Sequence, residues 1–389
     1  MQDRDEKDAE YGRELLTYAQ SVGLHRVGIC DTAVLDRARR EIIRRRDAGL
    51  ADTMQFTFRN PQRSTDPGRT LTQAASLIVG ARRYVDDSDT GEEHLPENSA
   101  RVARYARADH YAALRTSLNL VAERLRRDGY AAAVFVDEND LVDREVAYKA
   151  GLGWFGKSAN ILVPGGGSWY VLGSVVTSAP LEPTARRVPD GCGSCRVCID
   201  ACPTGAIVAD GVVDARRCLA WLVQKEGVFP FDHRVALGDR LYGCDDCQET
   251  CPPNVRFRRR ASNAVFDSSP TGDAGVDLFD VLEADDASLM ERFGRWYIAG
   301  RDPTWLRRNA LIILGNVAPV PVSDRVRHTV ERYLTHPDPH LRSQSVWTAA
   351  RLGLAREALS VRGDDHPLVV AELDRWEEVP SRMPSGSPS

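Results

Sequence analysis

The sequence contains no long apolar run. Its first residues, MQDRDEKDAE, are charged, so we expect neither a secretory signal peptide nor a membrane-spanning helix. Two nucleotide-binding motifs are also missing. The segment Gly156-Lys157-Ser158 lacks the glycine spacing of a Walker loop, and no GxGxxG pattern opens a long helix. These absences predict a protein of the reducing cytoplasm that is neither a P-loop nor a dinucleotide-binding enzyme.

The chain also has little net charge, −5 over 389 residues, which gives no overall attraction to nucleic acid. The charge is nevertheless unevenly distributed. Residues 301–356 hold nine arginines against four acidic residues, and Arg256, Arg258, Arg259 and Arg260 follow the last cysteine closely. Such a concentration of positive charge suits a polyanionic partner, although a solvated helical surface explains it equally well.

The length and the pattern of residues predict several domains. A chain of 389 residues, 42% apolar and 28% charged, is globular but too long for one ordinary core. Apolar residues recur at helical spacing in 306–314, 326–334 and 341–352, which predicts stacked helical repeats near the end. We expect an α/β domain over 1–184, a cysteine-rich domain over 185–260, an α-helical domain over 261–379 and a disordered tail over 380–389.

In the first domain, short apolar stretches predict strands that alternate with amphipathic helices. Asp137 follows directly on the expected strand 131–136. Loops at strand ends often carry chemistry, because a rigid sheet fixes where the side chain points. The alternative for Asp137 is an ordinary solvated loop acid. The other expected strands are 25–30, 76–80, 161–163 and 169–176, and the helical patterns lie at 11–22 and 118–125.

Eight of the nine cysteines lie between Cys192 and Cys251. The first run, CGSCRVCIDACP, has the CxxCxxCxxxCP spacing of two-cluster ferredoxins, in which three thiolates hold one [4Fe-4S] cluster and the fourth ligates the other. The second run, CDDCQETCPP, is one cysteine short, and a lone upstream cysteine can supply it. The spacing predicts two ligand sets: Cys192, Cys195, Cys198 and Cys251, and Cys202, Cys218, Cys244 and Cys247.

Two other uses of these cysteines are weaker hypotheses. Paired CxxC motifs can bind structural zinc, but the triple CxxCxxC followed by CxxxCP fits crossed ligation of two clusters better. Disulfides stabilise small secreted domains, whereas this chain is long enough to bury its own core. The ninth cysteine, Cys30, ends an apolar stretch and is expected to be a buried small hydrophobe.

The order of these pieces resembles the epoxyqueuosine reductase family of tRNA queuosine synthesis. The resemblance covers most of the chain, and YGCDDCQ together with AGLGW is more specific than a ferredoxin motif. It rests on Arg104-Tyr105-Ala106, Asp109-His110-Tyr111, AGLGWFGK (150–157), the cysteine framework, YGCDDCQETCP (242–252) and RRNALIILGN (307–316).

The resemblance implies an α+β fold: a nitroreductase-like α/β core that binds base-off cobalamin, a two-cluster ferredoxin module and C-terminal HEAT-like helices. It implies a reductase in which electrons pass from the clusters through cobalamin to the epoxide. An external flavodoxin or ferredoxin is expected to supply these electrons. The basic helices, including Arg307 and Arg308, are then expected to contact the anticodon stem-loop of tRNA. No DxHxxG segment offers a histidine to cobalt, since Asp338-Pro339-His340 lacks the glycine.

The resemblance also implies roles for individual residues. Asp137 matches the aspartate that protonates the departing oxygen, and a carboxyl near an apolar macrocycle can have its pKa raised enough for this task. Lys157 either contacts the cofactor or is surface charge. Asp245 and Asp246 either face the corrin or cap the cluster loop. The cofactor contacts implied are Arg104, Tyr105, Trp154, Lys157, Ala220, Asp245 and Asp246.

The chain departs from the family pattern near the substrate. The family usually has a small residue and then Ala-Pro after the aspartate, where this chain has Glu138-Asn139-Asp140; 219–225 and Ser158 also differ. The substrate is therefore less well defined than the cofactors. Two alternatives remain: a related reductase of another epoxide or halogenated compound, and an electron-transfer or tRNA-binding protein with an inactive corrin site.

The cysteine pattern makes a prediction about iron. Anaerobically purified protein should contain about eight iron atoms per chain, because each cubane carries four. Cys198→Ser should remove one cluster, whereas Cys30→Ser should leave the iron content unchanged. Metal analysis with visible absorption checks both, and stoichiometric zinc without charge-transfer absorption would contradict the assignment.

Overall fold

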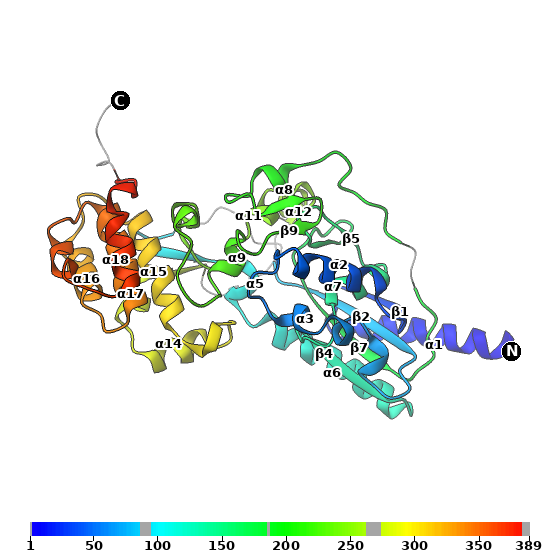
Figure 1. Cartoon of the computed structure of the whole chain (residues 1–389). Helices are drawn as coiled ribbons and strands as arrows, with labels where there is room; N and C mark the ends of the chain where they lie inside the picture. Colours follow the sequence, from blue (N-terminus) through cyan, green and yellow to red (C-terminus); the bar gives the residue numbers. More distant parts are fainter. Residues whose placement is uncertain (1, 86–94, 185–186, 262–273, 383–389) are drawn as a thin grey trace. The chain divides into compact units, whose positions relative to one another are not determined.

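The structure is a computed structural model that describes residues 2–85, 95–184, 187–261 and 274–382 (Figure 1). The chain forms two compact units, each built from three segments. Unit 1 comprises the described residues within Met1–Glu92, Ala108–Cys218 and Asp245–Thr271, and unit 2 those within Glu93–Arg107, Leu219–Cys244 and Gly272–Ser389. The expected division into three consecutive domains stays a prediction, and most of the tail expected at 380–389 lies outside the described residues.

Unit 1 is centred on a four-stranded antiparallel sheet in the order β1-β2-β7-β4. The mixture of helices and antiparallel strands agrees with the expected α+β class. Its elements are α1 Gln2–Ser21, β1 Arg26–Asp31, α2 Asp36–Asp47, α3 Phe56–Arg59, α4 Pro61–Ser64, β2 Ser76–Arg83, α6 His110–Arg127, β4 Ala132–Val136, α7 Asp143–Lys149, β5 Trp154–Phe155, β6 Ile161–Leu162, β7 Tyr170–Thr177, α8 Val197–Asp200, β8 Ile207–Ala209, β9 Val212–Val213, α11 Asp246–Glu249 and α12 Pro252–Ala261.

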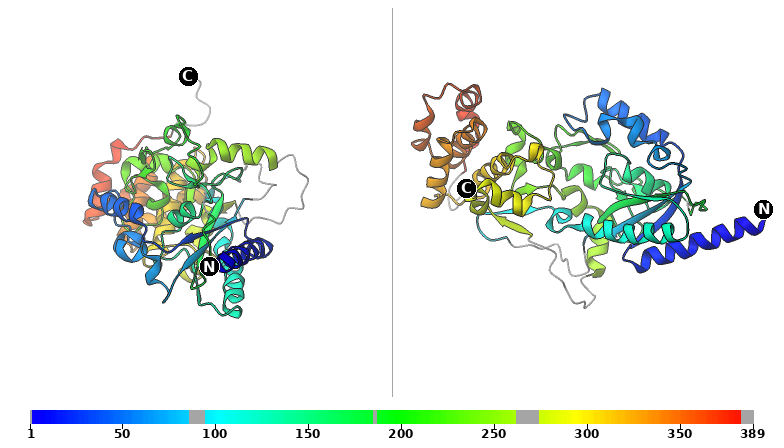
Figure 2. Two further views of the ribbon diagram at one scale, coloured as in Figure 1. Left: turned by 90° about the vertical axis from the view of Figure 1, so that its right-hand side faces the viewer. Right: turned by 90° about the horizontal axis from the view of Figure 1, so that it is seen from below.

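Helices cover both faces of this sheet. Alternate residues of a strand point to opposite faces, so Leu77 and Val79 of β2 pack with Val146 of α7, whereas Gly80 faces α6. Helix α1 lies beside α6, as Figures 1 and 2 both show. Cys30 is 1% exposed in the α7-side core, which confirms that it is a buried small hydrophobe.

Two glycines allow α6 to approach the sheet closely. Gly80 and Gly173 are paired across β2 and β7. A Cβ atom at Gly173 would lie 2.8 Å from Cδ1 of Leu118, and one at Gly80 would lie 3.2 Å from Cδ2 of the same leucine. A Cβ atom at Gly173 would require Leu118 to shift, and one at Gly80 would press on Leu24 and Leu118, so the lack of side chains at both positions lets α6 pack closely on the sheet.

The strands expected on either side of the glycine turn at 165–167 are present but belong to different sheets. Strand β6 pairs with β5, and β7 lies inside the four-stranded sheet between β2 and β4. A single bridge between Val163 and Gly167 closes the turn itself. The turn therefore connects two sheets.

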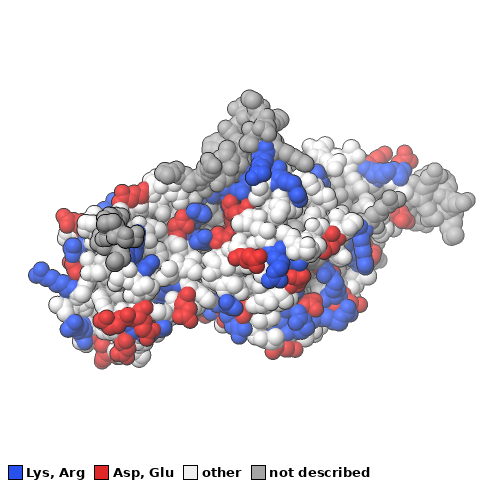
Figure 3. Space-filling model, turned by 90° about the horizontal axis from the view of Figure 1, so that it is seen from above, with Lys and Arg blue, Asp and Glu red and all other residues white. Residues whose placement is uncertain are grey.

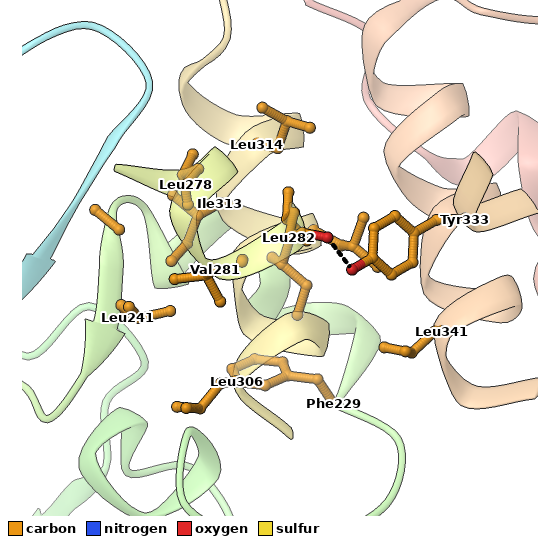
Figure 4. Close-up of a cluster of buried hydrophobic side chains, with 14 of the residues drawn as sticks. Phe229, Leu241, Leu278, Val281, Leu282, Leu306, Ile313, Leu314, Tyr333 and Leu341 are labelled. Atoms are coloured by element: carbon orange, nitrogen blue, oxygen red, sulfur yellow. Dashed lines mark hydrogen bonds between the residues drawn. The ribbon is translucent and has the colours of Figure 1, made fainter. Parts of the chain in front are cut away.

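Unit 2 combines a small sheet with a helical core. The sheet has the order β10-β3-β11, in which β3 pairs parallel with β10 and antiparallel with β11. Figure 4 shows apolar side chains from several of its elements meeting, with the Tyr333 hydroxyl donating to the carbonyl oxygen of Leu282 at 2.7 Å. Its elements are β3 Ser99–Val102, α5 Arg104–Arg107, α9 Leu219–Leu222, α10 Arg234–Leu237, β10 Arg240–Tyr242, β11 Gly275–Asp277, α13 Leu278–Glu283, α14 Asp286–Phe293, α15 Thr304–Val317, α16 Asp324–Leu334, α17 Pro339–Leu352 and α18 Pro367–Asp374.

Side-chain caps explain where several of these helices begin. Asp277, Asp285, Ser323 and Asp338 each accept a hydrogen bond from a backbone N–H in the first turn of the helix that follows. For Asp338 the donor is the N–H of His340, so the Asp338-Pro339-His340 sequence is a helix start.

The arginines of the helical end are largely engaged within unit 2. Arg308 is 1% exposed and donates to the carbonyl oxygens of Lys225, Gly227 and Leu222. Arg307 pairs with Asp286 at 2.5 Å. The expectation that Arg308 contacts RNA is therefore wrong, because sequence shows the charge of a residue but not its burial.

Other arginines of this region remain at the surface. Arg325 pairs with Glu283 at 2.9 Å, and Arg332 and Arg356 are exposed. Figure 3 shows both signs of charge interspersed over the face that it draws. None of the helices in the described part of the chain has the length and apolarity of a membrane span.

The burial of Arg308 leads to a stability prediction. Arg308→Ala should lower the free energy of unfolding by about 3 kcal/mol, because several buried carbonyl groups lose a charged donor. Arg325→Ala, which breaks an exposed ion pair, should cost less than about 1 kcal/mol and serves as the control. Denaturant unfolding followed by circular dichroism measures both, and equal effects would contradict the structural role of Arg308.

Candidate iron-sulfur and catalytic site

The first cysteine run is folded into tight turns around the short helix α8. The Cys195 N–H donates to the carbonyl oxygen of Cys192 at 2.9 Å, and the Cys202 N–H donates to that of Ile199 at 3.3 Å. The Cys202 sulfur accepts from the Ala206 N–H at 3.2 Å. Backbone N–H groups aimed at thiolate sulfur stabilise its negative charge and tune the reduction potential of a cluster.

The electrostatic neighbours of the cysteines indicate which of them lie close together. Burial raises the pKa of the Cys251 thiol to about 11, and Cys198, Cys192 and Cys195 add to the rise. These four are the predicted ligands of the first cluster. The charge of one group shifts the pKa of another only when the two lie close together, so these shifts indicate that the four thiols lie near one another.

The predicted second set has a similar signature. Burial is the largest cause that raises the pKa of the Cys247 thiol. The charges of Cys218, Asp245, Cys198 and Cys202 raise it further. Cys244, the remaining expected ligand, is the last residue of its segment in unit 2. Among the described residues no three Cys, His, Asp or Glu side chains are arranged to hold a single metal ion. Seven of the eight thiol donors, all but Cys244, belong to unit 1, and thiolate is the donor type that holds four-iron clusters.

A buried carboxamide fixes the second cysteine run to the glycine turn at 165–167. The Asn254 side chain, 0% exposed, accepts from the Ser168 N–H at 2.7 Å and donates to the Ser168 hydroxyl at 2.9 Å and the Gln248 carbonyl at 2.8 Å. Gly167 has φ 69°, and a Cβ atom there would lie 1.8 Å from Oδ1 of Asn254. The glycine is therefore required by the close approach of Asn254.

The same network continues to Asp245. The Tyr84 and Ser168 hydroxyls donate to Oε1 of Gln248 at 3.1 and 3.0 Å, and Nε2 of Gln248 donates to Oδ1 of Asp245 at 3.2 Å. Asp245 is 8% exposed, whereas Asp246 is half-buried at the start of α11. The Asp245 side chain is therefore part of the hydrogen-bonded network that holds the second cysteine run.

Two other expected cofactor residues of unit 1 lie against the cluster segments. Nζ of Lys157 pairs with Asp210, in the β8–β9 turn, at 3.2 Å. Trp154 lies against Gly191, just before the first cysteine, where a Cβ atom would be 2.6 Å from the indole ring. The indole Nε1 of Trp154 is buried and has no hydrogen-bond partner among the described residues. A bound cofactor with acceptor groups would satisfy this donor.

The expected cofactor residues of unit 2 are linked through Gln224. Its Nε2 donates to the carbonyl oxygen of Ala220 at 2.7 Å and to the Tyr105 hydroxyl at 3.4 Å. Arg104 precedes Tyr105 in α5 and is 4% exposed. The structure thus brings Tyr105 and Ala220 together, although they are far apart in the sequence.

Asp137 lies where β4 ends, as the sequence predicted. Its φ of 54° is in the left-handed region, which Asp adopts more readily than most residues. Desolvation raises the pKa of its carboxyl, while Arg144 and Arg115 lower it and Glu138 raises it. The residue as a whole is exposed. A raised pKa suits an acid that must carry a proton near neutral pH.

Sequence reasoning named Asp143 only as a substitute for Asp137 and did not identify Arg115 beside this acid. Asp143, at the start of α7, has a pKa raised well above its usual value by burial and then by the charge of Asp137. Arg115, on α6, donates to the carbonyl oxygen of Val136 at 2.9 Å. No spacing motif links these residues to Asp137.

Comparison with known proteins identifies the family. Residues 191–254 match the model of a 4Fe-4S double cluster binding domain. The chain is 34% identical over 334 residues to the epoxyqueuosine reductase of Vibrio cholerae serotype O1, covering 84% of this chain and 88% of the relative. It is 29% identical over 347 residues to that of Bacillus subtilis, covering 87% of each chain.

The chain belongs to the epoxyqueuosine reductase family. It therefore carries the two [4Fe-4S] clusters of the matched domain. Solved structures agree: an epoxyqueuosine reductase with an epoxyqueuosine-modified tRNA-Tyr stem loop matches with a TM-score of 0.83 and 26% identity, over 96% of this chain and 99% of that chain. The Bacillus subtilis enzyme, with an aspartate catalytic loop swung out of the active site, matches with a TM-score of 0.81, 26% identity and the same coverage.

The Asn254 network leads to a prediction for the clusters of this protein. Asn254→Ala should leave the buried Ser168 N–H unpaired and remove one of the two donors to the Gln248 carbonyl, which costs on the order of 2 kcal/mol. Iron should be released to a chelator faster than from the unchanged protein. Thr250→Ala, at an exposed position of the same run, is the control. Equal iron-release rates for the three proteins would contradict the anchoring role.

Proposed function

We propose that this protein reduces epoxyqueuosine in tRNA to queuosine. The observation that carries the proposal is the combination of family membership with an acid at the end of β4 whose pKa is raised by desolvation. Reduction of an epoxide to an alkene takes up two electrons and two protons and releases the oxygen as water. The two clusters handle only electrons, so a side chain must provide a proton to the oxygen.

Cobalamin in its base-off form is the proposed partner of the clusters. When bound, it supplies a metal centre that accepts electrons one at a time and gives them to carbon. In unit 1 the proposed contacts are Trp154, Lys157, Asp245 and Asp246, and the orphaned Nε1 of Trp154 supports this assignment. In unit 2 they are Arg104, Tyr105 and Ala220. For the clusters, the proposed ligands are the two sets of cysteines given above.

Asp137 is the proposed general acid. Its carboxyl holds the proton to a higher pH than an ordinary aspartate does, because desolvation disfavours the charged form. Activity should therefore decline as the pH rises through this raised pKa. The neighbouring Asp143 is half-buried, and burial and then the charge of Asp137 raise the pKa of its carboxyl. A family member with an aspartate catalytic loop supports the same assignment.

The finer parts of the fold and the partners are also proposals. We assign the sheet of unit 1 to a nitroreductase-like core and the helices α15 to α18 to HEAT-like repeats. The tRNA anticodon stem-loop is the proposed partner of the basic helical end, through exposed arginines such as Arg332 and Arg356. An external flavodoxin or ferredoxin is the proposed electron donor. The thiolates that hold the clusters suit the reducing cytoplasm.

The acid role can be tested by one substitution. Asp137→Asn keeps the size of the side chain but removes the transferable proton, which for a general acid typically costs ~10²- to 10⁴-fold in rate. Iron content, cobalamin binding and affinity for the tRNA should survive. The assay is anaerobic turnover of epoxyqueuosine-modified tRNA, with Asp47→Asn, at the exposed end of α2, as the control.

Two outcomes would count against the proposal. Near-normal turnover by Asp137→Asn would exclude Asp137 as the acid and leave Asp140 and Asp143 as candidates. If the unchanged protein holds both cofactors but does not act on the modified tRNA, the substrate assignment is wrong. In that case a related epoxide or halogenated compound becomes the substrate class to examine.

A further inference from the structure

Arg115 reaches residues on both sides of Asp137. Its Nη2 donates to the carbonyl oxygen of Val136 at 2.9 Å, and its Nη1 donates to Oε1 of Glu138 at 3.0 Å. One planar guanidinium therefore holds the end of β4 and the first residue after Asp137 together. The single ammonium group of a lysine does not reproduce this fork.

A second arginine holds the same segment further along. Arg63 of α4 donates from Nε to Oδ1 of Asp140 at 2.6 Å. Helix α4 is itself capped, because the Asn60 side chain accepts from the Arg63 N–H at 3.1 Å. Beyond Asp140 the buried Leu141 fixes the chain in the core under α7. The arginines thus hold the polar part of residues 137–142, and Leu141 holds its inner end.

The backbone conformation of Asp137 needs support from its surroundings. A φ of 54° is unfavourable for a residue with a Cβ atom and persists where the surroundings maintain it. Here one guanidinium bonds to both neighbours of the strained residue. The direction of the Asp137 side chain therefore depends on Arg115.

Charges around the carboxyl come from three elements. Besides burial, which raises the pKa of Asp137, Arg144 on α7 and Arg115 on α6 lower it, and Glu138 in the segment raises it. The fourth group is Asp143 on α7, whose own pKa is raised by burial and then by Asp137. Arg115 and Glu138 form an ion pair, yet Arg115 lowers the pKa of Asp137 and Glu138 raises it.

We propose that Arg115 and Arg63 are positioning residues that hold residues 137–142 through Glu138 and Asp140, so that Asp137 presents its carboxyl in one orientation. This inference rests on the proposed role of Asp137 as the acid. It gives a structural function to the stretch in which the chain departs from the family pattern. Glu138 and Asp140 then act on the acid and need not contact the substrate.

The test uses full-length protein loaded with its cofactors and compares Arg115→Gln, Arg115→Lys and Glu138→Gln. Glu41→Gln, which breaks an exposed ion pair on α2, is the control. Hydrogen exchange of the amides in 137–142 is measured on the millisecond-to-second scale, and kcat and KM are measured as a function of pH. Exchange reports on the segment without requiring activity.

We expect all three test variants to exchange about 3- to 10-fold faster in 137–142 and to lose kcat by a similar factor with little change in KM. The decline of kcat at high pH should shift to higher pH in Arg115→Gln, because the loss of a positive charge raises the pKa of Asp137. It should shift to lower pH in Glu138→Gln, because the loss of a negative charge lowers that pKa. Arg115→Lys keeps the positive charge but cannot form both hydrogen bonds, so the pH at which kcat declines should not change.

Unchanged exchange in Glu138→Gln and Arg115→Lys would overturn the proposal, as would faster exchange with unchanged kcat. Glu138→Gln changes an exposed side chain, so the test holds even where Arg115→Gln fails to fold. If Asp137→Asn retains turnover while exchange in 137–142 still depends on Arg115, the acid assignment fails and the positioning contacts stand.

Discussion

The side-chain amide of Asn254 joins the cysteine-bearing segment to the glycine turn beside the sheet of unit 1, and the placement of cluster ligands depends on it. The amide bonds to Ser168 through two atoms and to the Gln248 carbonyl, all away from water. In a low-dielectric interior such a fully satisfied network is rigid, and each missing partner is costly. These bonds therefore help to hold the cysteines of this run in place.

Local chemistry made part of this molecule predictable from sequence. The cluster ligands are separated by short stretches of chain, so their spacing can be read directly from the sequence. The family match over 191–254 agrees with this reading. Strand β2 follows a continuous apolar run, and Cys30 lies in the core as its neighbours suggested. Asp137 was recognisable because it stops an apolar strand.

What the sequence did not reveal depends on partners distant along the chain. Arg308 looks like any surface arginine until backbone carbonyls some eighty residues earlier surround it. The bond from Arg115 to Glu138 joins a helix to a loop without any spacing motif. Both units are assembled from three separated segments, which a linear division into domains does not anticipate.

The paired glycines in the middle of the sheet have a consequence for the distant acid. Gly80 and Gly173 set the depth at which Leu118 rests, and Leu118 lies on the same helix as Arg115. Close-packed interiors transmit displacements instead of absorbing them. A methyl group at either glycine would press on Leu118, and α6 is also the helix from which Arg115 reaches the segment around Asp137. The packing at the centre of this sheet is thus linked through one helix to the residues that border Asp137.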